Sequence, residues 1–314
     1  MKVCVTGAAG FIGGHLAEAL LREGHDVVGL DDFSSGKRET AVLLAKHAKF
    51  TLIEGSIADA DAARRAMQGA VQLFHLAAIP SVQLSMAEPQ RTTAVNVGGT
   101  VNVLEAARAA RVKRAVLACS CAAYGDGPEQ PKHENLVTRP MSPYAAQKIA
   151  CEALAQTYTR AYGFPCVALR FFNVYGPRQD PKSDYAAAIP RFTTRLLAGQ
   201  RPIVYGDGLQ TRDFVHVSDV VRATLLAAVS EKAPGEAINV ASGHSSSLID
   251  LIATLKKVIG GSAASLEIDH QAPRTGDVRA SSADISKARA LLGYQPGVSL
   301  AQGLAGVVEF FRGA

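Results

Sequence analysis

Short apolar, β-branched runs alternate with longer alanine- and leucine-rich segments through the first half of the chain. Apolar runs bounded by polar residues predict buried strands, and apolar residues three and four apart predict helices. Strands are expected at residues 3–6, 27–31, 50–54, 73–77, 115–120 and 167–172, with helices between them such as 12–22 and 95–110. This alternation predicts an α/β fold, a doubly wound parallel sheet with helices on both faces. In such sheets, sites gather at the carboxyl ends of the strands.

The pattern changes after about residue 173. Residues 190–199 predict a helix, and the sequence YGDG at 205–208 predicts a turn between extended segments. A strand followed by a helix is expected over 214–229, returning to the first lobe, and a mixed pattern begins near residue 242. We therefore expect one domain from 1–173 with 214–241, and a smaller mixed α/β C-terminal lobe from 174–213 and 242–314.

Composition narrows the class of protein. With 314 residues, 48% of them hydrophobic and 19% charged, the chain is an ordinary globular protein with room for two lobes. The net charge of +5 is scattered, which argues against nucleic-acid binding and suits an anionic small molecule equally well. No run approaches the roughly 18 apolar residues of a membrane span, so no membrane partner is expected. The five cysteines lack metal-ligand spacing, and free thiols in a cytoplasmic protein without a metal are predicted.

A glycine-rich turn opens the chain. In VTGAAGFIGGHL, Gly7, Gly10 and Gly13 lie between a predicted strand and a predicted helix. Glycines there allow a tight turn and let backbone N–H groups reach a pyrophosphate at the helix N-terminus, as in the Rossmann dinucleotide-binding fold. Asp31 ends the next strand, at the distance where an acid binds ribose hydroxyls. Asp32 follows it and would repel a 2′-phosphate, so NAD is predicted rather than NADP.

A second motif carries candidate chemistry. In SPYAAQK, Ser142 and Pro143 predict a helix start, and Tyr144 and Lys148 fall four residues apart on one helical face. An ammonium group beside a phenol lowers the phenol's pKa and favours its use as a base. Ser120 ends an apolar strand, where a substrate oxygen would be met. Alternatively, Ser120 ends its strand with a local backbone hydrogen bond.

Motifs spread over essentially the whole chain resemble those of the extended short-chain dehydrogenase/reductases. They are TGAAGFIGGHL, DDFSSGKR, HLAAIPSV, NVGGTVNVLEAA, SCAAYGD, SPYAAQK, LRFFNVYGPRQDP, YGDGLQTRDFVHVSDV and PRTGDVRASSADISKARALLGYQP. Within that family the chain is most similar to UDP-hexose 4-epimerases of the UDP-glucose/UDP-N-acetylglucosamine type. The resemblance implies a homodimer that binds NAD and a UDP-sugar.

The resemblance also implies a mechanism. Tyr144, assisted by Ser120, would take the proton of the sugar's 4-hydroxyl while a hydride passes from C4 to the nicotinamide. The resulting 4-keto sugar would turn about its diphosphate linkage and receive the hydride on its other face. Lys148 would also hold the nicotinamide ribose, and NAD would stay bound throughout.

The motifs and the resemblance together imply two sets of site residues. NAD is expected to contact Gly7, Gly10, Phe11, Ile12, Gly13, Asp31, Asp32, Ser35, Gly36, Ser56, Ile57, Leu76, Ala77, Ala78, Asn96, Tyr144, Lys148 and Phe171. The UDP-sugar is expected to contact Ser81, Ser120, Tyr144, Asn173, Ala188, Ile203, Tyr205, Gln210, Arg212, Arg274, Asp277 and Ser281.

Some of these residues have structural alternatives. Asn173 alternatively closes a strand end, Arg212 pairs with Asp213 or Asp219, and Phe171 belongs to the core.

Ser281 carries the prediction about substrate choice. In the family a tyrosine at this position restricts the pocket to a hydroxyl at the sugar's 2-position, whereas a small residue leaves space for an N-acetyl group. The serine therefore implies that both UDP-glucose/UDP-galactose and the N-acetylated pair are accepted.

The sequence departs from the family at four residues. Gly14 stands in place of the usual serine, and no effect is expected there. Ser56 stands where an aspartate commonly contacts the adenine, so the adenine is expected to be bound more weakly or differently. Cys121 and Ala122 stand where relatives often have serine or threonine, and Ala122 removes a second hydroxyl at the sugar.

Related activities remain as alternatives. A dehydratase needs acids directly after Ser120, and none is there. A UDP-glucuronate 4-epimerase or decarboxylase would need a cation on the sugar carboxylate, for which Arg178 and Lys182 are candidates. A non-catalytic NAD-binding protein is disfavoured by the presence of both Tyr144 and Lys148.

Overall fold

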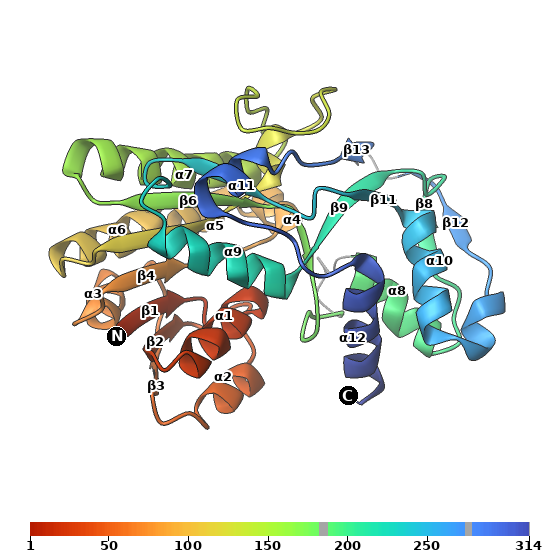
Figure 1. The fold of residues 1–314 in the computed structure, drawn as a ribbon, viewed down its shortest axis with the longest axis horizontal. Helices are drawn as coiled ribbons and strands as arrows, with labels where there is room; N and C mark the ends of the chain where they lie inside the picture. The colour runs from red at the N-terminus through yellow and green to blue at the C-terminus, as the bar shows by residue number, and fades with distance from the viewer. Residues whose placement is uncertain (182–187, 274–277, 314) are drawn as a thin grey trace.

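A seven-stranded parallel sheet forms the larger lobe of the protein (Figure 1), whose computed structural model describes residues 1–181, 188–273 and 278–313. The strand order is β10-β6-β5-β4-β1-β2-β3, which is the order of a doubly wound Rossmann sheet with one added edge strand. The predicted fold class is therefore confirmed. The strands are β1 (Lys2–Thr6), β2 (Asp26–Asp31), β3 (Phe50–Glu54), β4 (Gln72–His75), β5 (Arg114–Ser120), β6 (Cys166–Phe171) and β10 (Ala237–Val240).

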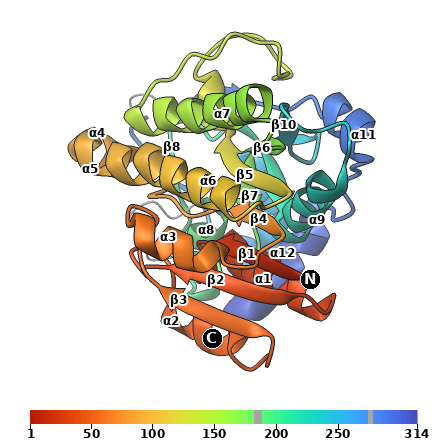
Figure 2. The same ribbon diagram turned by 90° about the vertical axis from the view of Figure 1, so that its left-hand side faces the viewer.

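Helices cover both faces of this sheet, and α7 and α9 lie on opposite sides of it in Figures 1 and 2. Their apolar faces complete two buried clusters, one on each side, which is why the strands are apolar on both faces. On one face lie α1 (Phe11–Arg22), α2 (Arg38–Leu44), α9 (Val217–Val229) and α11 (Ser286–Leu292). On the other lie α3 (Ala60–Met67), α6 (Gly99–Ala109) and α7 (Pro143–Tyr162), with α4 (Val82–Ala87) and α5 (Pro89–Thr93) packed beside α7.

The smaller lobe has its own core, formed where three amphipathic helices pack together. These helices are α8 (Ala188–Leu197), α10 (Leu248–Ile259) and α12 (Leu300–Arg312), and a short 3₁₀ helix, η3 (Gly261–Ser265), follows α10. Strand β8 (Ile203–Tyr205) pairs with β12 (Asp269–Gln271). A second small sheet joins β7 (Asn173–Tyr175), β9 (Thr211–His216), β11 (Ser245–Ser247) and β13 (Ala280–Ser281), with β9 paired to the other three.

Three local details differ from the predicted pattern. The strand expected at 214–216 lies in β9 of the small sheet, so the return to the large sheet begins with α9. Strand β4 ends at His75 because the next two amides turn away to the Thr6 hydroxyl. The helix expected over 95–110 begins with a wide π turn, η1 (Ala94–Gly98), whose Asn96 side chain bonds the backbone of Ile79. Such turns are frequent at functional sites.

The two lobes meet at the carboxyl ends of β1, β4, β5 and β6. Because β1 and β4 are neighbours whose connections leave in opposite directions, a crevice opens at this edge of the sheet. Within the three described stretches of the chain, no helix has the length and apolar character needed to cross a membrane.

Candidate active site

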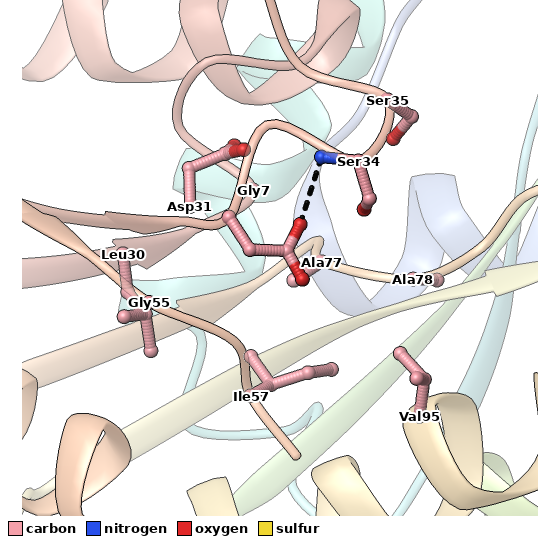
Figure 3. Close-up of a pocket in the computed structure, with 11 residues that line it drawn as sticks. Gly7, Leu30, Asp31, Ser34, Ser35, Gly55, Ile57, Ala77, Ala78 and Val95 are labelled. Atoms are coloured by element: carbon pink, nitrogen blue, oxygen red, sulfur yellow. Dashed lines mark hydrogen bonds between the residues drawn. The ribbon is translucent and has the colours of Figure 1, made fainter. Parts of the chain in front are cut away.

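A pocket opens at the carboxyl ends of β1, β2 and β4, beside the N-terminus of α1 (Figure 3). It includes seven predicted cofactor residues together with four that sequence reasoning missed, Leu30, Ser34, Gly55 and Val95. Each missed residue adjoins or nearly adjoins a predicted one in the chain, so proximity to the motif was the available signal. The pocket is lined by Gly7, Leu30, Asp31, Asp32, Ser34, Ser35, Gly55, Ile57, Ala77, Ala78 and Val95.

Two glycines make the base of this pocket possible. Gly7 has a left-handed φ of +74°, and a Cβ there would lie 2.8 Å from the backbone nitrogen of Ala77. A Cβ on Gly13 would lie 1.9 Å from the carbonyl oxygen of Gly7, so α1 approaches the turn after β1 only because Gly13 has no side chain. The N-terminus of α1 begins after Gly10 without a side-chain cap, as expected where an anion completes the helix end.

Asp31 and Asp32 define the polar end of the pocket. The Asp31 carboxylate accepts hydrogen bonds from the backbone N–H groups of Ala9 and Phe33, both at 2.9 Å. Burial raises the pKa of Asp31 and outweighs these two bonds. Burial also favours the neutral form of Asp32, but hydrogen bonds centred on Ser34 hold the pKa of that carboxyl below its usual value. The dashed line in Figure 3 marks the bond from the Ser34 amide.

Ser56, a departure from the family, has a defined local role. Its hydroxyl lies within hydrogen-bonding reach of the Asp32 carboxylate and accepts a bond of 3.3 Å from the Ala58 amide. The serine therefore supports the acidic end of the pocket.

The remaining predicted cofactor residues surround the same edge of the sheet. Phe11 and Ile12 begin α1, Gly36 lies in the turn before α2, and Leu76 directly follows β4. Asn96 is buried, and its amide also donates 2.8 Å to Gln147 of α7. Phe171 is buried in the core cluster, yet it also pairs in register with Ser120.

The pocket residues fit the adenosine half of NAD. Small side chains and glycines leave room for the backbone to approach a pyrophosphate, and Asp31 offers acceptor oxygens for ribose hydroxyls. No cation lies among the lining residues that the structure describes, and two carboxylates stand where a 2′-phosphate would have to be neutralised.

Ser120, Tyr144 and Lys148 come together at the ends of β5 and α7. Ser142 caps α7 by accepting from the Ala145 amide (3.2 Å), which places Tyr144 in the first turn. The Ser120 hydroxyl lies within hydrogen-bonding reach of the phenol. Lys148 Nζ donates 2.8 Å to the Ala118 carbonyl and lies 5.9 Å from the Tyr144 ring centroid.

Ser120 takes part in two interactions at the end of β5. It caps the 3₁₀ helix η2 (Cys121–Tyr124) by accepting from the Ala122 amide at 3.2 Å, which is the local backbone bond. It also faces Tyr144. The backbone bond orients the hydroxyl toward the phenol.

The electrostatics of the pair differ from the sequence-based prediction in one respect. Burial raises the pKa of Tyr144 above its usual value, and this effect outweighs the lowering by the Lys148 charge and the Ser120 hydroxyl. Burial opposes the charge on Lys148, but the adjacent Tyr144 oxygen holds the pKa of the ammonium above its usual range. Lys148 thus lowers the pKa of Tyr144, as predicted, but the effect of burial on that pKa is larger. With these protein groups alone, Tyr144 is therefore a neutral phenol at pH 7.

Two buried residues that the sequence did not single out support this arrangement. The Ser85 hydroxyl accepts 3.0 Å from the Tyr144 amide, joining α4 to the start of α7. His75 lies between the hydroxyls of Thr6 (2.7 Å) and Thr100 (2.9 Å), and burial lowers its pKa to about 3, with Lys148 adding to the shift. A neutral histidine under the sheet edge therefore adds no competing positive charge near the lysine.

The smaller lobe brings predicted substrate residues from distant segments beside this centre. Ser281 in β13 pairs in register with Arg212 in β9. Burial raises the pKa of the Cys121 thiol to about 12, while the Arg212 charge lowers it and the Asp213 charge raises it. The charges of β9 therefore act on the turn after β5, the strand that ends with Ser120.

The structural alternatives for two of these residues have different outcomes. Asn173 donates 3.1 Å to the Asp213 carbonyl, so its side chain does join two strand ends. Arg212 donates 2.8 Å to the Thr211 carbonyl. The Asp213 carboxylate accepts hydrogen bonds from Ser242 and from the Gly243 amide.

The other predicted substrate residues lie in several different elements and make different contacts. Ser81 is buried and caps α4 by accepting from the Leu84 amide at 2.8 Å. Gln210 donates 2.9 Å to the carbonyl of Tyr205, fixing the turn after β8. Ala188 and Ile203 begin α8 and β8. Arg274 and Asp277 lie outside the described residues.

Comparison with known proteins places this site in a family. The model of the NAD dependent epimerase/dehydratase family matches residues 3–241. The chain belongs to this family, and its cofactor is NAD.

Similar members of the epimerase family act on different sugars. The chain is 42% identical to a UDP-glucose 4-epimerase of Mycolicibacterium smegmatis, covering 99% of both proteins. It is 36% identical, with a TM-score of 0.94, to a UDP-N-acetylglucosamine 4-epimerase of Methanobrevibacter ruminantium M1 in complex with UDP-N-acetylmuramic acid, covering 99% of this chain and 98% of the other. It is 34% identical, with a TM-score of 0.91, to a UDP-glucuronic acid 4-epimerase of Bacillus cereus bound to UDP-glucuronic acid and NAD, covering 100% and 99%.

These relatives share an epimerase scaffold and differ at the sugar. Similarity therefore identifies the epimerase family, whereas the choice of sugar has to be argued from the pocket residues of this chain.

Two ion pairs connect the lobes of this epimerase family member on the side of α1. Arg178 donates 2.9 Å to Glu18 of α1, and Lys37 lies 3.3 Å from Asp180. These two ion pairs join the chain after β7 to the cofactor-binding lobe.

Proposed function

We propose that this protein is an NAD-dependent UDP-hexose 4-epimerase that interconverts UDP-glucose with UDP-galactose and also the N-acetylated pair. The observation that carries the proposal is the position of the Tyr144 phenol, with the Ser120 hydroxyl and the Lys148 ammonium beside it at the sheet edge that holds the cofactor pocket.

When bound, NAD would supply a reversible two-electron oxidation at C4 of the sugar, and the positive charge of its oxidised form would favour the phenolate. Tyr144 takes the proton from the 4-hydroxyl and later returns it to the 4-oxo oxygen. Ser120 holds that oxygen by hydrogen bonding, and the Lys148 charge stabilises the phenolate. Ala122, two residues further on in η2, has no hydroxyl, so Ser120 holds the 4-oxo oxygen without a second hydroxyl from that position.

One observation supports neutral hexoses: Arg178, one of two cations considered for a sugar carboxylate, is paired with Glu18 of α1 at 2.9 Å. The other cation considered, Lys182, lies outside the described residues. The N-acetylated pair is proposed from Ser281, a small side chain that pairs in register with Arg212. The alternative is a UDP-glucuronate 4-epimerase, favoured by the similarity to the Bacillus cereus enzyme over the full chain.

The decisive experiment measures turnover of UDP-galactose, UDP-N-acetylgalactosamine and UDP-galacturonate by the NAD-containing protein. Conversion of the first two, with little conversion of the third, supports the proposal. A preference for UDP-galacturonate would establish the alternative.

The catalytic role is tested with Tyr144→Phe. Its kcat should fall about 10³-fold, with NAD content unchanged, because proton transfer is lost and the fold is kept. Tyr162→Phe is the matched control, since Tyr162 ends the same helix and is 57% exposed. Unchanged activity in Tyr144→Phe would refute the mechanism.

A further inference from the structure

Asn239 is a completely buried polar residue on β10, the outermost strand of the large sheet on the side of the smaller lobe. Its Oδ1 accepts 2.7 Å from the Tyr124 hydroxyl. Its Nδ2 donates to two backbone carbonyls, those of Lys132 (2.9 Å) and Asp284 (3.2 Å). We call these four residues the Asn239 junction. Because a buried amide that loses its partners is costly, the junction holds three distant segments in one relative position.

The first partner leads to the catalytic centre. Tyr124 is the last residue of η2, the turn that Ser120 caps. The Arg170 guanidinium lies 4.8 Å above the Tyr124 ring and forms two hydrogen bonds, 2.8 and 2.6 Å, with Glu152 of α7.

Glu152 follows Lys148 by four residues and Tyr144 by eight, so all three lie along one face of α7. The side of the junction formed by Tyr124 is therefore rigidly connected both to Ser120 and to the helix that carries the catalytic pair.

The second set of partners leads to Ser281. The Lys132 amide donates 2.8 Å to the Ser282 carbonyl, and the Asp284 amide donates 2.9 Å to the Lys132 carbonyl. Residues 282–284 are thus bonded to the loop at Lys132, while Ser281 just before them pairs with Arg212. The junction therefore clamps residues 282–284, which directly follow β13. We call β13, the strand that carries Ser281, the β13 wall.

The Asp213 carboxylate reinforces this wall from the other side. Asp213 is completely buried in β9, and it accepts from Ser242 and from Gly243. It also lies within hydrogen-bonding reach of the Ala283 amide. Segment 281–284 is therefore held between Asp213 of the smaller lobe and Asn239 of the larger one.

We propose that Asn239 is a positioning residue for substrate selection: it sets the distance between the Ser120–Tyr144 centre and the β13 wall that carries Ser281. This assignment rests on the proposed function for the identity of the substrate. Because Asn239 contacts the carriers of both groups and not the reacting atoms, its removal changes sugar binding more than proton transfer.

The test is Asn239→Asp, which keeps the size of the side chain and the acceptor for Tyr124 but replaces the donor to both carbonyls. We expect KM for the UDP-sugar to rise roughly tenfold, the factor for about one buried hydrogen bond, while kcat changes less than about threefold. We also expect the preference between the plain and N-acetylated substrates to shift. Tyr124→Phe, which removes one bond and keeps the ring, should show a smaller rise in KM.

Asn102→Asp is the matched control. The Asn102 amide also donates to two carbonyls, those of Ile57 (3.2 Å) and Ala58 (3.0 Å), but on the cofactor side. This variant should weaken NAD retention without shifting the sugar preference.

Amide hydrogen exchange gives a readout that is independent of the substrate. In Asn239→Asp the amides of residues 282–284 should exchange faster, whereas those of α1 should not. If the wild-type protein epimerises no UDP-hexose, the proposed function fails, and the exchange result still decides whether the junction positions β13. Unchanged exchange at 282–284, or a fall in kcat with unchanged KM and preference, would overturn the assignment of Asn239.

Discussion

The cofactor side and the sugar side of this site are built in different ways. The cofactor pocket comes from consecutive βα units between Gly7 and Val95, and its shape depends on glycines and short loops next to strand ends. The predicted sugar side combines residues of both lobes: Ser120 at the end of β5, and Arg212 and Ser281, which pair in register in the smaller lobe and lie up to 161 positions away in the chain. The comparison shows that one half is a local motif and the other is a product of strand pairing and buried polar contacts.

The largest effect is expected from a substitution on the cofactor side. In Gly13→Ala the new methyl would lie 1.9 Å from the Gly7 carbonyl oxygen, so α1 must move away from the turn after β1. We expect loss of bound NAD and destabilisation by about 3 kcal/mol or more, as for severe overpacking. Thermal unfolding and NAD content of the purified protein measure both.

The control for that change is Gly306→Ala in α12, where nothing lies within 4 Å of the added methyl. This variant should be neutral or up to about 1 kcal/mol more stable, because alanine favours a helix. If both variants bind NAD equally, close packing at Gly13 is not what shapes the pocket.

The next effect concerns the centre between the two sides. Lys148→Met removes the charge that lowers the pKa of Tyr144, so burial raises that pKa still further. The base form is the phenolate, whose fraction grows with pH; kcat at pH 7 should therefore fall about 10²-fold and the rise of activity should move to higher pH.

Rates between pH 6 and 10 for the wild type and Lys148→Met test this shift. Lys113→Met, on the exposed stretch before β5, serves as the control. A Lys148→Met profile that coincides with the wild-type profile over this range would mean that the ammonium does not act on the phenol.

A smaller and selective effect is expected on the sugar side. Ser281→Tyr places a ring next to Arg212 in β9, where a 2-acetamido group is proposed to lie. Activity on UDP-N-acetylgalactosamine should fall about 30-fold or more, whereas that on UDP-galactose should change little, because a clash affects only the larger substrate. Equal loss of both activities, or of neither, would remove Ser281 as the gate.

The smallest effect is expected from a change in an ion pair that connects the two lobes. Arg178→Ala removes the ion pair with Glu18, whose side chains are each 20% exposed. Partly exposed pairs contribute little, about 0.2–1 kcal/mol, so bound NAD should dissociate only a few-fold faster. Stopped-flow release of NAD measures the rate. Arg201→Ala breaks the exposed pair with Glu267 inside the smaller lobe and should leave the rate unchanged; equal rates in both variants would show that the contact between lobes does not retain the cofactor.

Sequence and structure agree most closely where chemistry follows from neighbours in the chain. Gly7 and Asp31 were predicted from a turn and a strand end, Ser35 was predicted from the family resemblance, and all three line the pocket. The spacing of Tyr144 and Lys148 predicted a shared helical face, and the structure places both beside Ser120. Periodicity and spacing are local properties, so they can be read without knowing the rest of the fold.

Other features depended on contacts that no local pattern encodes. The net pKa direction of Tyr144 follows from burial under both lobes, which a helix motif does not express. Ser81 was predicted at the substrate, and the structure adds that its hydroxyl caps α4, a contact that the motif did not indicate. Strand β9 has an ordinary strand pattern, yet its pairing with β7, β11 and β13 places it in the smaller lobe.

By itself, the sequence determined the doubly wound sheet, the preference of its pocket for NAD and the identity of the catalytic serine, tyrosine and lysine as candidates. Only the tertiary structure decided how far the β13 wall lies from that centre. We propose that this distance is set by Asn239 and Asp213, two buried polar groups bonded to segments far away in the chain. Local backbone preference acts over a few residues, whereas a buried hydrogen bond is satisfied only when the whole chain has folded around it.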